Sequence, residues 1–267
     1  MAELIKANIA AGLTYYRRSK LLLAFMLLFL LLTGLQSLPS IFMDSGVQSF
    51  NSLRQVISTL NGFLLILAAG MGLLIMSSHL RNRSLKMVFT KPCPPAVWLL
   101  STFLSAALVS LLLNMVVLTG GIVLSLVWHF PVRVGLFFVS AQTFAISLGL
   151  MSYLALLGTV MHPVLAAVVA LIFNAELFYD FHLWTLGAIQ SGYNHWALRA
   201  LERVFHVFYI ALPMLDPFDD KTANIHSSLR VLSNEWKYLL FSFGYALALS
   251  TFCYFVSLYA LQRKNHI

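Results

Sequence analysis

The sequence predicts an all-α protein that crosses a membrane about six times, as a single domain over residues 1–267. Hydrophobic residues make up 60% of the chain and charged residues 10%. Soluble chains contain about 45–50% hydrophobic and about 25% charged residues. The mean hydropathy is +0.85. Six apolar stretches approach or exceed the roughly 20 residues that cross about 30 Å of hydrocarbon. A soluble domain of this size cannot bury so many apolar side chains, so we expect the bilayer to be their solvent.

The six predicted spans cover much of the chain, at residues 21–38, 58–77, 97–128, 134–161, 163–179 and 237–261. The third is too long for one simple crossing, so it either bends at Thr119-Gly120-Gly121 or projects into water at both ends. The fourth and fifth are separated by little more than Met161-His162-Pro163. Because proline disfavours the helical conformation of the residue before it, we expect a tight helical hairpin there.

The basic residues predict the orientation through the positive-inside rule. With both termini in the cytoplasm, ten basic residues near span ends are cytoplasmic: Lys6, Arg17, Arg18, Lys20, Arg81, Arg83, Lys86, Lys91, Arg263 and Lys264. The other seven are outside, mostly in the long loop 180–236, which has little weight in the rule. We therefore expect a multi-pass protein of the plasma or inner membrane. The net charge of +8 is explained by orientation and does not indicate nucleic-acid binding.

Two amphipathic helices are predicted outside the spans. Residues 2–16 place apolar side chains at helical spacing, namely Leu4, Ile5, Ile9, Leu13 and Tyr16. This pattern suits a short helix in the cytoplasmic interface, and the alternative is an N-terminus that orders only in part. The second helix runs from His195 to Leu212, with apolar and charged residues on opposite faces, and Pro213 ends it. We expect it to lie at the outer interface or to re-enter the bilayer between spans five and six.

Motifs for catalysis or metal binding are weak. The chain has no GxxxxGK[ST] phosphate loop and no HExxH, and its eight histidines and two cysteines show no ligand spacing. One acidic cluster, formed by Asp216, Asp219 and Asp220, follows a proline in the outer loop. Paired carboxylates can bind Mg²⁺ and a diphosphate, but a turn or a helix start explains this cluster better. We expect no metal and no cofactor in this chain.

Four polar residues fall within or at the ends of the predicted spans: Asn114, Gln142, Asn174 and Glu176. A carboxylate inside a membrane is a candidate for function. Glu176 lies close to the outer end of span five, so a position in the interface is favoured. Asn114 and Gln142 are expected to join helices through hydrogen bonds.

The most distinctive segment is the cytoplasmic loop 78–95. Its basic residues surround an apolar set, Leu85, Val88 and Phe89, and three prolines then end any helix. A short basic amphipathic helix at a membrane surface either rests on anionic lipid or presents side chains to a partner protein. The residues alone leave both uses open.

At this loop the chain resembles the permease subunits of ATP-binding-cassette transporters of the type-two, exporter-like class. In that family a cytoplasmic coupling helix between spans two and three ends in a proline-containing turn, the place that Arg83-Ser84-Leu85 through Thr90-Lys91-Pro92 occupies here. The outer residues Leu212-Pro213-Met214, Phe218-Asp219 and His226 are similar to a segment that precedes span six in many such permeases. The chain departs from the family at Asn82 and Ser84, where an acidic residue and a glycine are common.

The resemblance implies a transporter subunit with no ATPase activity of its own, paired with a second permease subunit that is either a copy or a paralogue. Separate nucleotide-binding subunits, which hold ATP and Mg²⁺, are expected to dock on Arg81, Arg83, Lys86, Phe89 and Lys91. Export is expected from the class, and the few charges within the spans favour a lipid-like, hydrophobic or peptide substrate. Two other hypotheses stay open. One is a membrane-embedded enzyme that acts on a lipid or isoprenoid diphosphate through Asp216, Asp219 and Asp220, and the other is a non-transporting scaffold.

Overall fold

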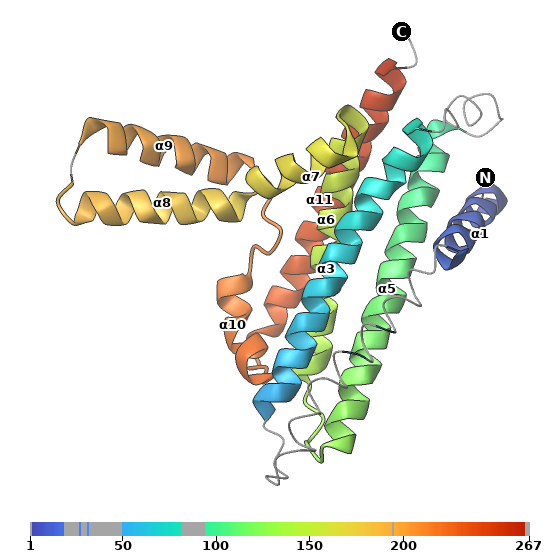
Figure 1. Ribbon diagram of the computed structural model, residues 1–267, viewed down its shortest axis with the longest axis horizontal. Helices are drawn as coiled ribbons and strands as arrows, with labels where there is room; N and C mark the ends of the chain where they lie inside the picture. Colours follow the sequence, from blue (N-terminus) through green and yellow to red (C-terminus); the bar gives the residue numbers. More distant parts are fainter. Residues whose placement is uncertain are drawn as a thin grey trace.

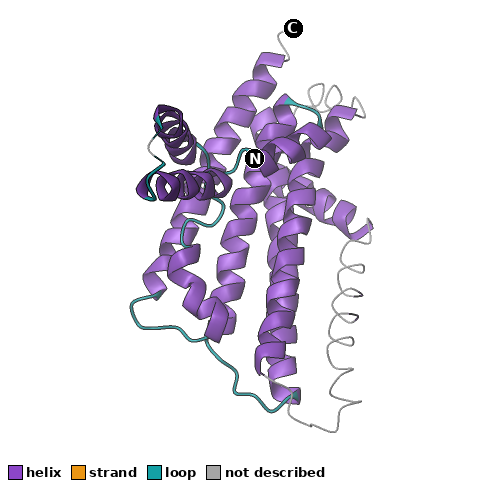
Figure 2. Ribbon diagram, turned by 60° about the vertical axis from the view of Figure 1, so that its left-hand side comes forward, coloured by secondary structure: helices purple, strands orange, loops and turns teal. Residues whose placement is uncertain are grey.

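The computed structural model describes residues 2–18, 27, 31, 50–81, 94–193 and 195–264, and these ranges form helices joined by short loops (Figures 1 and 2). The helices are α1 (Ala2–Arg18), α3 (Phe50–Arg81), α5 (Pro95–Val127), α6 (Gly135–Val160), α7 (Pro163–Ile172), α8 (Ala175–Gln190), α9 (Trp196–Ala211), α10 (Asp219–Ser228) and α11 (Trp236–Lys264). No strand occurs within the described ranges. The predicted all-α class is therefore confirmed. The predicted first span, 21–38, lies outside the described residues except for Leu27 and Leu31.

Five apolar stretches of the described chain are long enough to cross a membrane: Phe50–Ile75, Pro95–Val127, Gly135–Val160, Pro163–Gln190 and Trp236–Arg263. The protein is thus a multi-pass membrane protein. Four of these stretches belong to α3, α5, α6 and α11, which run side by side along the length of the molecule (Figure 1). They correspond to the predicted second, third, fourth and sixth spans.

The helix α6 lies at the centre of this bundle and packs against α3, α5 and α11. Small and hydroxyl-bearing residues make the close approach possible. A Cβ added to Gly72 of α3 would lie 2.7 Å from the Met151 carbonyl oxygen of α6. The Oγ atoms of Ser110 on α5 and Ser147 on α6 are 2.8 Å apart and share a hydrogen bond. These contacts bring the helix backbones together without large side chains between them.

Larger apolar side chains fill the space between α3 and α5. Every fourth residue of each helix turns to the same face, so Val56, Leu60 and Leu64 of α3 meet Val109, Leu113 and Val117 of α5 in one buried cluster. The helix α3 begins at Phe50, earlier than the predicted span. Leu53, Val56 and Ile57 are buried in hydrophobic clusters, but in the sequence they alternate with polar residues such as Arg54 and Gln55. Mixed polarity hides this part of the helix from a prediction based on hydropathy.

The fifth apolar stretch differs from the expectation of one continuous helix over 163–179. It is divided into α7, which has ten residues and is about 15 Å long, and α8. Phe173 leaves the helical conformation, and the Asn174 side chain then accepts a hydrogen bond from the Leu177 N–H at 2.7 Å, which caps α8. The two helices α8 and α9 form an antiparallel hairpin that projects sideways from the bundle (Figure 1).

The N-terminal helix is present as predicted. Its inner face packs across α5, where Tyr16 is buried and a Cβ added to Gly12 would lie 2.5 Å from Ser105 Oγ. The outer amphipathic helix predicted from His195 to Leu212 is also present as α9, which ends before Pro213. Their positions in a membrane interface remain predictions.

Candidate functional site

Two of the predicted polar residues of the spans, Gln142 and Glu176, meet the predicted acidic segment in one place. We call this group the Gln142 cluster: Gln142 of α6, Glu176 of α8, Asp216 of the α9–α10 loop, and Thr222 and His226 of α10. It joins three parts of the chain that are far apart in sequence. We therefore treat it as the candidate functional site.

Gln142 is fully buried and uses both ends of its amide. Its Nε2 donates to Asp216 Oδ1 at 3.1 Å and to Thr222 Oγ1 at 3.0 Å. Its Oε1 lies 3.2 Å from His226 Nε2. Because the amide oxygen can only accept, Nε2 carries the proton of the imidazole in this arrangement. The amide of Gln142 thus holds the α9–α10 loop and α10 against the spanning helix α6.

Asp216 is the charged group at the centre of the cluster. Its backbone N–H donates to Glu176 Oε1 at 3.0 Å, and its Oδ1 accepts from the Phe218 N–H at 3.4 Å. Burial raises the pKa of Asp216 from its ordinary value of 3.8 to about 6, helped by the neighbouring charges of Asp219 and Glu176 and opposed by the hydrogen bonds from Gln142 and Phe218. This carboxyl therefore changes its charge near neutral pH.

His226 is the second titratable group held by Gln142. Burial lowers the pKa of His226, while the charge of Asp219 opposes this effect. The neutral imidazole is favoured in this position. Its hydrogen bond to Gln142 therefore does not depend on protonation at neutral pH.

Two arginines fasten the other end of α10. Arg54 of α3 donates to the Ser227 carbonyl at 2.7 Å, and Arg133 donates to the Ser228 carbonyl at 2.8 Å. These carbonyls belong to the last turn of α10, where a helix leaves its acceptors unpaired and its dipole favours cations. The helix is thus bound to the bundle at both ends.

The cluster opens into a cavity of about 420 Å³ that five carboxylate residues line. These are Glu176, Asp180, Asp216, Asp219 and Asp220. The carboxylates are spread around the walls, and the described part of the chain has no three Asp, Glu, His or Cys side chains grouped to hold a metal ion. We call this space the acidic cavity. Its chemistry suits water and positively charged groups.

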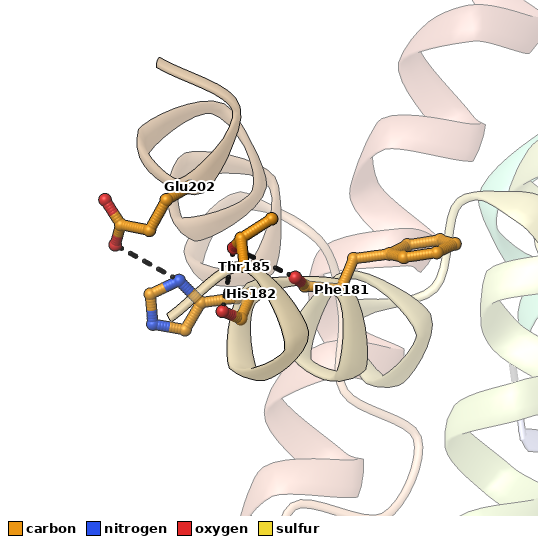
Figure 3. Close-up of polar contacts among 4 residues, drawn as sticks. All are labelled: Phe181, His182, Thr185 and Glu202. Atoms are coloured by element: carbon orange, nitrogen blue, oxygen red, sulfur yellow. Dashed lines mark hydrogen bonds and ion pairs between the residues drawn. The ribbon is translucent and has the colours of Figure 1, made fainter. Parts of the chain in front are cut away.

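The α8–α9 hairpin is held by stacked aromatic rings and one polar contact. Phe178 stacks on Phe208 with ring centroids 5.0 Å apart, and Phe181 stacks on Phe205 at 5.3 Å. Figure 3 shows His182 of α8 pointing to Glu202 of α9, where Nδ1 lies 3.3 Å from Oε1. This pair is ionic when the imidazole is protonated.

Thr185 occupies the same turn of α8 and is satisfied within its own helix. Its Oγ1 lies within hydrogen-bond distance of the carbonyls of Phe181, at 3.0 Å, and His182, at 2.9 Å (Figure 3). The hydroxyl therefore needs no partner from α9. His182 and Glu202 are in contact across the hairpin, but His182 Nδ1 makes no hydrogen bond within the described residues, so the stacked aromatic rings provide most of the packing.

The other predicted site residues lie apart from this cluster. Asn174 caps α8. Asn114 is buried, its Nδ2 donates to the Ser110 carbonyl of its own helix at 2.9 Å, and its Oδ1 has no partner among the described residues. Of the predicted partner contacts, Arg81 is the last residue of α3, and Arg83, Lys86, Phe89 and Lys91 lie outside the described residues.

Sequence reasoning missed Thr222 and His226 as partners of Gln142. The signal available was their spacing: positions 222 and 226 are one turn apart and therefore share a face of α10. Comparison of the chain with family models, with curated proteins and with solved structures finds no match.

Proposed function

We propose that this chain is the permease subunit of an ATP-driven transporter of the ATP-binding-cassette class. In this proposal it hydrolyses no ATP itself and is driven by separate ATPase subunits. In this proposal the segment 78–95 is the docking site and a second permease subunit completes the transporter. The termini are cytoplasmic, the membrane is the plasma or inner membrane, and the direction is export.

The observation that supports this function best is the length of α3 and α5. They have 32 and 33 residues, which correspond to about 48 and 50 Å, whereas the hydrocarbon is about 30 Å thick. Both helices therefore extend beyond it. Their neighbouring ends, Arg81 and Pro95, are the two ends of the basic segment. A protein that pushes on this segment acts directly on two long, stiff helices.

Other elements brace the same end of the bundle. Tyr254 of α11 donates from its hydroxyl to the Ala96 carbonyl at 3.0 Å, next to the start of α5. The helix α1 packs on α5 through Gly12 and Ser105. A displacement of the basic segment would therefore move α1, α5 and α11 together.

Contacts within the bundle offer a route for this motion to the far end. Gly72 of α3 touches the backbone of Met151 on α6, and Gln142 of the same helix α6 holds Asp216. Interfaces between packed helices shift in discrete steps. ATP-driven tilting of α3 would therefore reach the Gln142 cluster and change the fit of α10 on the bundle.

A groove between α5, α6 and α11 supports a hydrophobic substrate. It has a volume of about 390 Å³, and its apolar lining includes Phe103, Leu104, Met151, Leu247 and Phe255. All three helices contain candidate membrane spans. Substrates with hydrocarbon chains match this lining best.

The alternative is an enzyme that acts on a lipid or isoprenoid diphosphate through Asp216, Asp219 and Asp220, which line the acidic cavity. It would need a divalent cation to offset the charges, and the described residues include no group of three ligands placed to hold one. Alanine at Asp216, Asp219 and Asp220 abolishes such an enzyme, whereas the transporter retains ATPase capture through the 78–95 segment. Two measurements on this triple variant distinguish the readings: capture of the ATPase, and turnover of a lipid diphosphate in comparison with wild type.

The experiment that tests the transporter is affinity purification of the tagged full chain in a mild detergent, followed by identification of co-purifying proteins and an ATPase assay. The test variant is Arg81→Glu/Arg83→Glu/Lys86→Glu. The matched control, Arg17→Glu/Arg263→Glu/Lys264→Glu, makes the same change of charge on other residues assigned to the same side. We expect an ATPase with a phosphate loop to bind wild type and control and to be lost from the test variant. Recovery of no such ATPase in several detergents contradicts the proposal.

A further inference from the structure

The α8–α9 hairpin projects sideways from the bundle at a level between the two ends of its long helices (Figure 1). The ten residues of α7 lead to it over about 15 Å, and this helix exposes Val164, Leu165 and Leu171 by 58–73%. The hairpin root is fixed where the Tyr153 hydroxyl of α6 donates to the Phe173 carbonyl at 3.0 Å. Tyr153 lies two turns before the end of α6, or about 10 Å. The hairpin root therefore lies beside α6, about 10 Å along the helix from its end.

The hairpin carries exposed charged residues beside the long helices of the bundle. Glu176 and Asp180 are exposed on α8 and border the acidic cavity, and Arg203 is exposed on α9. Charged groups within a membrane face a protein interior or a water-filled space, because hydrocarbon offers them no partner. The same hairpin exposes Trp184 by 65% and Val207 by 63%, which does not suit open water. A surface of this mixed character fits a protein partner.

The two helices of the hairpin carry complementary charges. The face of α8 that carries Glu176 and Asp180 lines the acidic cavity, and α9 exposes Arg203. In a two-fold symmetric interface each copy supplies the same patch, so a patch with both signs can pair with itself. In such an interface a second copy would bring Arg203 to the acidic cavity and cover Trp184 and Val207.

We infer that the α8–α9 hairpin is the surface on which two copies of this chain pair, with Arg203 of each copy against the acidic face of α8, at Asp180, in the other. The inference rests on the proposed pairing of two permease subunits and names the surface. The acidic cavity is then closed only in the assembled pair.

The test uses two charge reversals, Asp180→Arg and Arg203→Asp, in full chains with two different affinity tags. In a pair of identical Asp180→Arg chains the new Arg faces Arg203 of the other copy, and in a pair of identical Arg203→Asp chains the new Asp faces Asp180. Because juxtaposed like charges cost several kcal/mol, we expect self-association to fall at least about tenfold for each variant alone. When the two variants are expressed together, each Arg meets an Asp, and capture of one tag with the other returns toward the wild-type value. This recovery also shows that both variants fold.

Arg263→Asp is the matched control, because it reverses an exposed charge on α11 far along the chain from the hairpin. We expect wild-type association for it. Two results overturn the inference: association of each single variant at the wild-type level, or loss of association that the mixed pair does not restore. Capture of the ATPase through the 78–95 segment is measured in the same samples. It reports on the proposed function separately, since a failed hairpin test leaves that capture unchanged.

Discussion

Replacing Asp216 with Asn should stabilise the protein at neutral pH and leave its stability nearly unchanged in acid. Asp216 is held by Gln142 and Glu176 in a site where burial raises its pKa from 3.8 to about 6. The folded protein thus favours the neutral carboxyl. Asn at this position keeps an acceptor oxygen for Gln142 and carries no charge at any pH.

The sign and size follow from the pKa of Asp216 in the two states. Because the pKa of Asp216 is raised in the folded protein, the stabilising contribution of its neutral form is fully present below about pH 4, its ordinary pKa. This contribution is lost as the pH rises through about 6. One unit of pKa corresponds to about 1.4 kcal/mol, so the charged Asp216 costs the folded state about 3 kcal/mol above pH 6. We expect Asp216→Asn to recover up to this amount at pH 7.5 and almost nothing at pH 4.

The measurement is the thermal or denaturant stability of purified wild type and Asp216→Asn from pH 4 to pH 8. Burial lowers the pKa of His226, which has the opposite effect, with stability lost as the pH falls. It is present in both proteins, so the difference between them isolates Asp216. A difference that does not grow between pH 4 and pH 7.5, or a variant less stable than wild type at pH 7.5, would refute the reasoning.

Two glycine contacts give further predictions. Gly72→Ala should destabilise the protein by about 1–3 kcal/mol, because the added Cβ meets backbone atoms of Met151. Gly70→Ala, which meets nothing within 4 Å, should be neutral or stabilising in thermal unfolding; equal effects of the two would contradict this packing. Gly12→Ala should separate α1 from α5 at Ser105 and speed amide exchange in α1. Gly62→Ala is its control, since it also meets nothing within 4 Å, and unchanged exchange in Gly12→Ala would count against the contact.

The long helices could be predicted from the sequence because hydrocarbon leaves the backbone few choices. A segment inside a membrane must satisfy its own hydrogen bonds, so length and apolar content determine a helix. The predicted spans 97–128 and 134–161 match α5 and α6 closely for this reason. The start of α3 was missed because Asn51 and Gln55 lower the hydropathy of a segment whose inner face is apolar.

The Gln142 cluster could be predicted only in part. Gln142 was expected to join helices, and it does. Its partners, however, are 74–84 residues away in the chain. Nothing in the local pattern says which of the polar residues in the outer loop meets an amide on a spanning helix. Such pairing depends on how α10 folds back onto α6, and that is a tertiary property.

The break between α7 and α8 shows how two polar residues redirect an apolar stretch. By length and composition, Pro163–Gln190 is a single candidate span. Hydropathy treats Asn174 and Glu176 as two tolerable interruptions, yet each has a specific partner. Asn174 caps α8 through the Leu177 N–H, and Glu176 binds the Asp216 N–H. The cap starts a new helix in a new direction, and the carboxylate ties that helix to the Gln142 cluster. The sideways hairpin and the polar site therefore have a common origin in these two residues.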